Sequence, residues 1–143
     1  SVNGRKPKEL SGPNRSHFFY GYDKVAEKYS MRYLGIPLPI ILVEGIFDQI
    51  KIQSFGAECL ALMGSSISDI QIGKLARWAP PKIILMMDGD DAGRKATETI
   101  ANRLGRRMNP MAISKIYLPE GKDPDELTRG EFEKLLDGGC KGD

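Results

Sequence analysis

Four short apolar runs, each separated from the next by a longer amphipathic stretch, constrain the fold of this chain more than any other feature. The runs cover residues 40–43, 58–63, 82–87 and 113–118. Short runs rich in Ile, Leu and Val predict strands that are buried on both faces. Helical patterns lie between them, and the alternation predicts right-handed crossovers. We therefore expect an α/β fold with a mainly parallel four-stranded sheet and helices on both faces.

The expected helices have recognisable starts and stops. One helix covers residues 46–54 and ends at Phe55-Gly56. Ser68 with Gln71 forms a capping box, and Pro80-Pro81 stops the helix that it opens. Ala92, Ala96, Ile100 and Leu104 share one face of a longer helix, which Asp90 or Asp91 should cap. Thr128 with Glu131 predicts a last helix that extends through Leu136.

The composition bounds the class of protein. A chain of 143 residues with 41% hydrophobic and 28% charged residues fits one soluble globular domain. No apolar run approaches the roughly 20 residues of a membrane helix, so no membrane partner is expected. Cys59 and Cys140 form neither a disulfide framework nor a metal-ligand spacing, which favours a reducing, cytoplasmic setting. Because the chain begins with Ser1 rather than Met, we expect a segment of a longer protein.

The first 35 residues differ from the rest. Gly, Pro and Asn interrupt them, and they contain an aromatic cluster at residues 18–20 and a helical pattern over residues 23–34. We divide the chain into a lead-in segment (1–35), the α/β domain (36–128) and a C-terminal helix with a tail (129–143).

Acidic residues follow the ends of several expected strands. They are Glu44 after the first strand, Asp88, Asp90 and Asp91 after the third, and Asp123 and Asp125 beyond the fourth, with Asp48 one helical turn after Glu44. Ligands of open parallel sheets bind beyond the carboxyl ends of the strands. Carboxylates crowded at such an edge repel one another unless a cation neutralises them. Oxygen ligands without His or Cys suit Mg²⁺ or Mn²⁺ and argue against Zn²⁺.

Each acid taken singly has a simpler explanation. An Asp at the end of a strand is most often a helix N-cap, and a single Glu is most often a solvated loop residue. The joint pattern, with Glu-Gly after one strand and Asp-Gly-Asp after another, is more specific than any one of its members.

The same residues carry a family resemblance. Val43-Glu44-Gly45 with Asp48, and the stretch from Met87 to Ala96, resemble the two signature motifs of TOPRIM domains. The Ala92-Gly93-Arg94 extension and the segment Leu118 to Leu127 resemble the branch found in bacterial-type, DnaG-like DNA primases, including those of phage primases and primase–helicases. The resemblance spans roughly residues 36–128, and the lead-in is weakly similar to the end of the preceding primase subdomain.

The resemblance implies a set of roles. Glu44, Asp88 and Asp90 would be catalytic and would bind Mg²⁺ or Mn²⁺, and Asp123, Asp125 and Asp48 would add metal contacts. Their positive charge makes Arg94, Lys95 and Lys122 candidates for binding nucleotide phosphates, and a solvated face of the first helical turn is the alternative for Arg94 and Lys95. The implied function is template-directed synthesis of RNA primers for DNA replication, an activity of the nucleotidyltransferase type. The implied partners are a single-stranded DNA template, nucleoside triphosphates and a replicative helicase.

The chain has neither a zinc-ligand cluster nor the length for the basic subdomain that primases place before this domain. We therefore expect an incomplete active centre. Two other functions stay open: a non-catalytic TOPRIM module that binds nucleic acid or acts as a scaffold, and a fragment of a TOPRIM nuclease or topoisomerase. The acids argue against the first, because a scaffold has no need of crowded like charges. A topoisomerase needs an activated tyrosine, and no tyrosine of the lead-in is marked as one.

Overall fold

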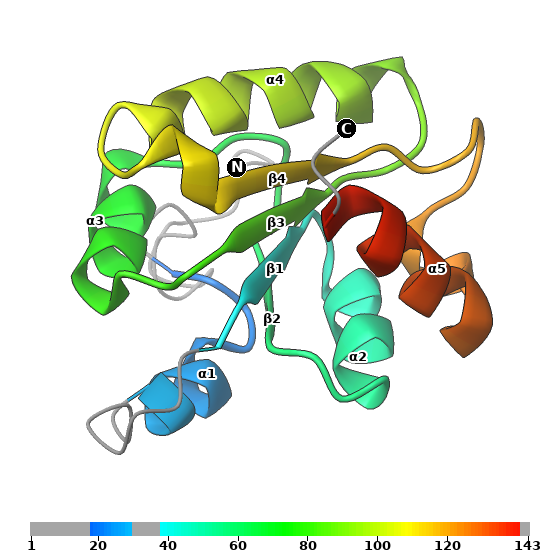
Figure 1. Cartoon of the computed structure of the whole chain (residues 1–143), viewed down its shortest axis with the longest axis horizontal. Helices are drawn as coiled ribbons and strands as arrows, with labels where there is room; N and C mark the ends of the chain where they lie inside the picture. The colour runs from blue at the N-terminus through cyan, green and yellow to red at the C-terminus, as the bar shows by residue number, and fades with distance from the viewer. Residues whose placement is uncertain (1–17, 30–37, 141–143) are drawn as a thin grey trace, which may run out of the picture.

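The sheet has four parallel strands in the order β2-β1-β3-β4. A computed structural model describes residues 18–29 and 38–140 of the chain (Figure 1). The strands are β1 (Ile40–Val43), β2 (Cys59–Ala61), β3 (Ile83–Met86) and β4 (Ile113–Ile116). Both neighbours of β1 pair with it in parallel, with Ile41 opposite Cys59 of β2 and Ile84 of β3. The expected α/β fold is confirmed, and every strand pair of this sheet is parallel.

Helices cover both faces of the sheet, as expected (Figure 1). One face carries α1 (Tyr22–Tyr29), α3 (Asp69–Trp78) and α4 (Asp91–Gly105). The other face carries α2 (Ile46–Ser54) and α5 (Arg129–Cys140). Two short 3₁₀ helices, η4 (Pro110–Ala112) and η5 (Pro124–Glu126), flank β4.

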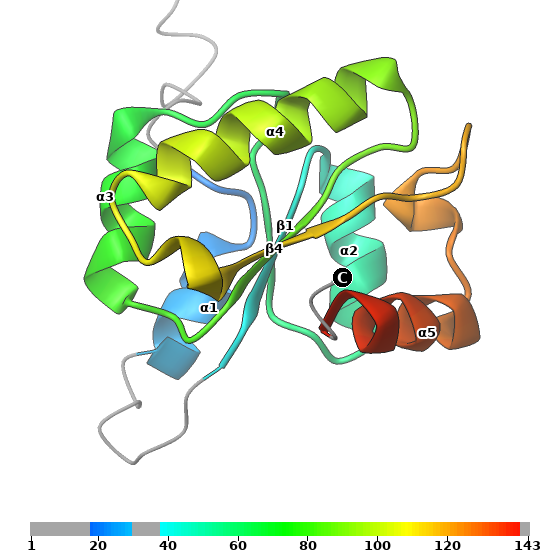
Figure 2. The ribbon, with the colours of Figure 1, turned by 45° about the horizontal axis from the view of Figure 1, so that its top comes forward.

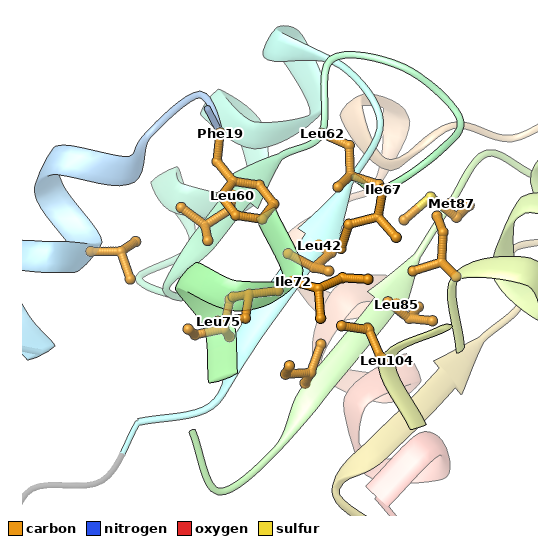
Figure 3. Close-up of a cluster of buried hydrophobic side chains, with 14 of the residues drawn as sticks. Phe19, Leu42, Leu60, Leu62, Ile67, Ile72, Leu75, Leu85, Met87 and Leu104 are labelled. Carbon is orange, nitrogen blue, oxygen red and sulfur yellow. The ribbon is translucent and has the colours of Figure 1, made fainter. Parts of the chain in front are cut away.

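The alternation of side chains along the strands builds two separate hydrophobic cores. Ile40 and Leu42 point to the α1/α3/α4 face, whereas Ile41 and Val43 point to the α2/α5 face. All four are at most 2% exposed, which explains why the strand is apolar at every position. Figure 3 shows the first of these cores, where Leu42 and Leu85 of the sheet meet residues of the covering helices.

The described part of the lead-in packs into the first core. Phe19, Val25 and Tyr29 are buried there. The rings of Tyr22 and Tyr29 stack on Trp78, with centroids 4.8 and 5.1 Å apart. The helix expected over residues 23–34 begins at Tyr22 and is described as far as Tyr29. Residues 30–34 lie outside the described part.

The lead-in also contacts the edge of the sheet. The backbones of Tyr20 and Ala61 exchange two hydrogen bonds of 3.0 Å, which form an isolated antiparallel bridge on the outer side of β2.

The predicted helix starts are confirmed in atomic detail. The Oγ of Ser68 accepts from Gln71 N at 3.1 Å, and the Oγ1 of Thr128 accepts from Glu131 N at 3.1 Å. The expected end of the last helix at Leu136 is too early, because α5 continues to Cys140. Glycines such as Gly138 lower helix propensity by about 1 kcal/mol but do not break a helix. None of the described helices has the length and apolar character that crossing a bilayer would require.

Candidate metal centre

Glu44 and Asp88 lie next to each other at the carboxyl edge of the sheet. They follow the adjacent parallel strands β1 and β3, so both leave the sheet at the same edge. The Oε2 atom of Glu44 accepts a hydrogen bond from the backbone N–H of Asp88 at 3.2 Å. Two expected metal ligands that are distant in sequence are thus joined directly.

Asp48 connects this pair to the loop after β4. It lies in the first turn of α2 and is buried, with 8% of its surface exposed. Its Oδ2 accepts from Gly45 N at 3.3 Å, and its Oδ1 accepts from Asp125 N at 3.1 Å. Asp48 therefore holds η5 against the start of α2, which brings the third acidic segment to the same edge.

Asp123, Asp125 and Glu126 form the tightest acidic group. Each offers a carboxylate oxygen, and these oxygens all lie within 4.8 Å of one another. Among the described residues, this is the one group of three His, Cys, Asp or Glu side chains that close together. Glu126 was not expected from the sequence. Its spacing from Asp123 across Pro124 is that of a capping box, and its Oε1 accepts from Asp123 N at 2.7 Å.

Asp90 caps a helix and also lies at the carboxyl edge of the sheet. Its Oδ1 accepts from Gly93 N at 2.7 Å, so it is the N-cap of α4. Of the two residues that could cap this helix, Asp90 is the one that does. Its neighbour Asp91 is exposed and pairs with Arg94. Asp90 still acts electrostatically on Glu44 and Asp88.

We call the six expected ligands, together with Glu126, the acidic rim. Its members are Glu44, Asp48, Asp88, Asp90, Asp123, Asp125 and Glu126.

Glycines let the acidic rim pack this closely. A Cβ on Gly93 would overlap the carbonyl oxygen of Asp88, and a Cβ on Gly89 would overlap that of Pro119. Gly89 donates to Lys122 O at 2.8 Å and accepts from Gly121 N at 2.6 Å. The turn after β3 is therefore fastened to the loop after β4 by backbone contacts that only glycine permits at position 89, and α4 packs closely on the same turn because position 93 is glycine.

Burial and like charge raise the pKa of several rim carboxyls. Burial raises the pKa of Asp88 to about 7, with smaller contributions from the negative charges of Glu44, Asp48, Asp123 and Asp90.

Asp48 and Glu44 are shifted in the same direction. Burial raises the pKa of Asp48 to about 6, although its hydrogen bonds from Asp125 and Gly45 act in the opposite direction. Burial also raises the pKa of Glu44, partly offset by the hydrogen bond from Asp88. The negative charges of neighbouring rim carboxylates also raise both pKa values, and a bound cation would relieve this repulsion.

One buried carboxylate oxygen of the acidic rim accepts no hydrogen bond from the described residues. The Oδ1 of Asp88 is buried, and none of the residues that the structure describes donates a hydrogen bond to it. Leaving a buried carboxylate oxygen unpaired costs about 1–3 kcal/mol or more. An all-oxygen set of ligands with one unpaired oxygen fits a hard divalent cation such as Mg²⁺.

Two of the three expected phosphate-binding cations form ion pairs with carboxylates. Arg94 pairs with Asp91 at 2.6 Å and with Glu120 at 2.8 Å. Lys122 pairs with Glu131 at 3.0 Å. Lys95 is exposed on α4. Surface ion pairs of this kind contribute about 0–1 kcal/mol, so a phosphate group could replace the carboxylate partners at small cost.

Comparison with known proteins identifies relatives of this chain. The family model described as Toprim-like matches residues 41–128. The chain is 37% identical to the DNA primase of Rickettsia bellii over 143 aligned residues, which cover 92% of the chain but 23% of that protein.

Two solved structures of primases are similar to this chain in fold. The crystal structure of a DNA primase domain from Pseudomonas aeruginosa has a TM-score of 0.72 and 29% identity, covering 87% of the chain and 39% of that structure. The DnaG primase catalytic domain bound to single-stranded DNA has a TM-score of 0.71 and 25% identity, covering 91% and 40%. The chain thus spans about a quarter of the Rickettsia bellii protein that it matches.

A first prediction concerns the contact between Gly93 and Asp88. Gly93→Ala should lower the free energy of unfolding by about 2 kcal/mol or more, because the new Cβ forces the turn after β3 away from α4. Gly130→Ala is the matched control, since its Cβ would meet nothing within 4 Å. This control should be neutral or stabilising by up to about 1 kcal/mol. Urea unfolding measures both, and equal stability of the two variants would contradict the packing argument.

A second prediction concerns pH. The pKa of Asp88 and that of Asp48 are raised in the folded state, to about 7 and about 6. Their contribution to stability is complete below the ordinary pKa of about 4 and is lost as the pH rises through 6 to 7. In EDTA, the protein should therefore be more stable at pH 5.5 than at pH 8, by about 1 kcal/mol after screening.

The variant Asp88→Asn tests the assignment of this pH dependence. It removes the carboxyl with the larger shift, so the difference in stability between pH 5.5 and pH 8 should shrink by half or more. An unchanged difference in Asp88→Asn, measured by urea unfolding at both pH values, would assign the effect to other groups.

Proposed function

We propose that this chain, which belongs to the Toprim-like family and is a relative of bacterial DNA primases, is the metal-binding part of a primase active centre. The acidic rim would bind Mg²⁺, or Mn²⁺ in its place, and would support template-directed synthesis of RNA primers. The observation that carries the proposal is the buried, unpaired Oδ1 of Asp88 among carboxylates whose pKa values are raised by burial. That arrangement is unfavourable for an apo protein and favourable for a cation site.

The reaction we propose joins two nucleotides. The 3′ hydroxyl of one ribonucleotide attacks the α-phosphate of an incoming nucleoside triphosphate, a phosphodiester bond forms, and pyrophosphate leaves. When bound, the divalent ion supplies Lewis-acid activation of the hydroxyl and neutralises charge on the phosphates.

The residues of the chain have distinct parts in this proposal. Glu44, Asp88 and Asp90 would be the central ligands, and Asp48, Asp123 and Asp125 would hold the outer contacts. Because Asp48 accepts hydrogen bonds from Gly45 and Asp125, its main task would be to position the loops. Fixed ligands lower the reorganisation needed when charge develops in the transition state.

Arg94 and Lys122 would turn from their carboxylate partners to the phosphates of the triphosphate, and Lys95 would add a further positive charge. Surface ion pairs with Glu120 and Glu131 are weak enough for such an exchange.

The rest of the machinery would lie in the remainder of the parent protein. One structural relative, the DnaG primase catalytic domain, is bound to single-stranded DNA, and we propose such a strand as the template here. Nucleoside triphosphates and a replicative helicase complete the proposed partners, and the proposed setting is the cytoplasm, where bacteria replicate their DNA.

A topoisomerase-like function has less support than primer synthesis. Among the described tyrosines, Tyr117 is the one that lies outside the lead-in. Burial and the negative charge of Glu98 raise the pKa of Tyr117 to about 12. A nucleophilic tyrosine needs a lowered pKa or an adjacent base that takes its proton. The hydroxyl of Tyr117 donates to Glu98, but that hydrogen bond and Lys115 lower the pKa of Glu98, which makes it a weak base.

The third prediction tests the metal site. Mn²⁺ or Mg²⁺ at ten times its dissociation constant should stabilise the chain by about 1.4 kcal/mol, which corresponds to a rise of several degrees in melting temperature. Asp88→Asn combined with Asp90→Asn should abolish this rise while leaving the metal-free stability equal or higher. Asn at position 90 preserves the N-cap of α4. An equal rise in the double variant would rule out this site.

The fourth prediction tests the activity in the full-length parent. Glu44→Gln or Asp88→Asn should lower primer synthesis by on the order of 100-fold or more, while template affinity changes by less than about twofold. Template affinity depends on basic groups that contact phosphates, whereas the carboxylates act in the chemical step. The readouts are a primer-extension gel and fluorescence anisotropy with labelled single-stranded DNA.

Lys134→Gln, an exposed change on α5, is the control for these two variants. Normal priming by Asp88→Asn would favour the scaffold alternative. The isolated 143-residue chain should show little or no synthesis, so robust synthesis by this chain alone would overturn the hypothesis of an incomplete active centre.

A further inference from the structure

Two segments of the chain carry several cations and no acidic residue. Two long segments, residues 70–87 and residues 99–119, contain no Asp or Glu. Between them they carry seven cations: Lys74, Arg77, Lys82, Arg103, Arg106, Arg107 and Lys115. The acidic rim lies at the carboxyl edge, and α4 leads from that rim, at Asp90, to the cationic end, at Arg106. Three of these cations, Arg103, Arg106 and Arg107, lie at the end of α4 away from the acidic rim.

Four arginines at this end lie along the contact between α3 and α4. Figures 1 and 2 show α3 beside the C-terminal end of α4. Arg103 of α4 pairs with Asp69 at the start of α3 and also donates to the carbonyl of Ile67. Arg107 lies over α3, where its Nη2 would be 3.9 Å from a Cβ on Gly73.

Arg77 and Arg106 extend this surface. Arg77 follows Gly73 by four residues, so it lies on the same face of α3 as Asp69 and Gly73. Arg106 is the C-cap residue of α4. We call Arg77, Arg103, Arg106 and Arg107 the arginine patch.

The arginine patch has little internal neutralisation. Arg77, Arg106 and Arg107 are exposed, and within residues 18–29 and 38–140 none of the three takes part in an ion pair. Helix C-termini do favour cations, by about 0.3–1 kcal/mol each. That preference accounts for single arginines at the ends of α3 and α4. It does not account for two acid-free segments that meet at one place.

We propose that the arginine patch binds the phosphate backbone of a nucleic acid strand whose other part lies at the acidic rim. Arginine forks match phosphate oxygens in geometry and charge. The 15 residues of α4 correspond to about 22 Å at 1.5 Å per residue, and phosphates in a duplex strand follow one another about every 3.4 Å. The patch would hold the strand roughly six nucleotides from the reacting end. The attraction between the arginines and the phosphates would offset the repulsion of that strand by the acidic rim.

The choice of nucleic acid over another polyanion rests on the proposed function. The binding itself needs neither metal nor turnover, so it is measured in EDTA on the 143-residue chain. The probe is a fluorescein-labelled 12-nucleotide single-stranded DNA, followed by anisotropy between 50 and 200 mM NaCl, concentrations that we choose because phosphate contacts are salt-sensitive in this range.

Arg106→Gln combined with Arg107→Gln should weaken binding about tenfold at low salt and reduce the slope of log K against log salt by about 1.4, or 0.7 for each lost contact. Lys24→Gln with Lys134→Gln removes the same charge from exposed positions on α1 and α5 and should change affinity by less than about twofold. Arg106→Lys with Arg107→Lys should recover most of the binding and the slope, which separates loss of charge from loss of folding.

Several outcomes would overturn the proposal: no measurable binding by the wild-type chain, equal effects of the arginine and lysine double variants, or tighter binding to polyglutamate of equal charge than to the DNA. Asp88→Asn with Asp90→Asn should leave DNA binding in EDTA unchanged or stronger. A failed metal site with intact, arginine-dependent DNA binding would therefore contradict the proposed function alone, and the reverse result would contradict the arginine patch alone.

Discussion

Two backbone hydrogen bonds of Gly89, one to Lys122 and one from Gly121, fasten the turn after β3 to the loop after β4, and the acidic rim depends on them. The sheet brings Glu44 and Asp88 together because β1 and β3 are parallel neighbours. It does not place Asp123 or Asp125, which lie beyond the end of β4. The hydrogen bonds of Gly89 bring that loop across, and Asp48 then holds it through Asp125. These backbone contacts hold the like-charged carboxylates close together in spite of their mutual repulsion.

The sequence is sufficient for the features that depend on local chemistry. An apolar residue at every position predicts a strand that is buried on both faces, as in the run from Ile40 to Val43. Ser68 and Thr128 predict helix starts because the capping box is a contact between residues three apart. Parallel order follows from the alternation of strands and helices, and the family motifs place the acids at one edge.

Contacts between residues distant in sequence are beyond this reasoning. Nothing in the sequence pairs Arg94 with Glu120 or Asp48 with Asp125, which are 26 and 77 residues apart. Glu126 escapes prediction because its contact with Asp123 is a backbone cap, which is not a signal for a metal ligand. The stacking of Tyr22 and Tyr29 on Trp78 likewise depends on the packing of α1 against α3, which periodicity does not encode. Local patterns specify elements, whereas side-chain partners across elements depend on the assembled fold.

The bridge between Tyr20 and Ala61 bears on where this fold can be cut. The segment that the family model matches begins at residue 41, but β2 would then present part of its outer side as unpaired N–H and C=O groups. Bare strand edges recruit strands of other molecules. Cutting there would also remove Phe19, Val25 and Tyr29 from the core and leave an apolar surface in their place. The smallest piece that stays monomeric at high concentration should therefore begin before Phe18, so that motif boundaries underestimate the folding unit.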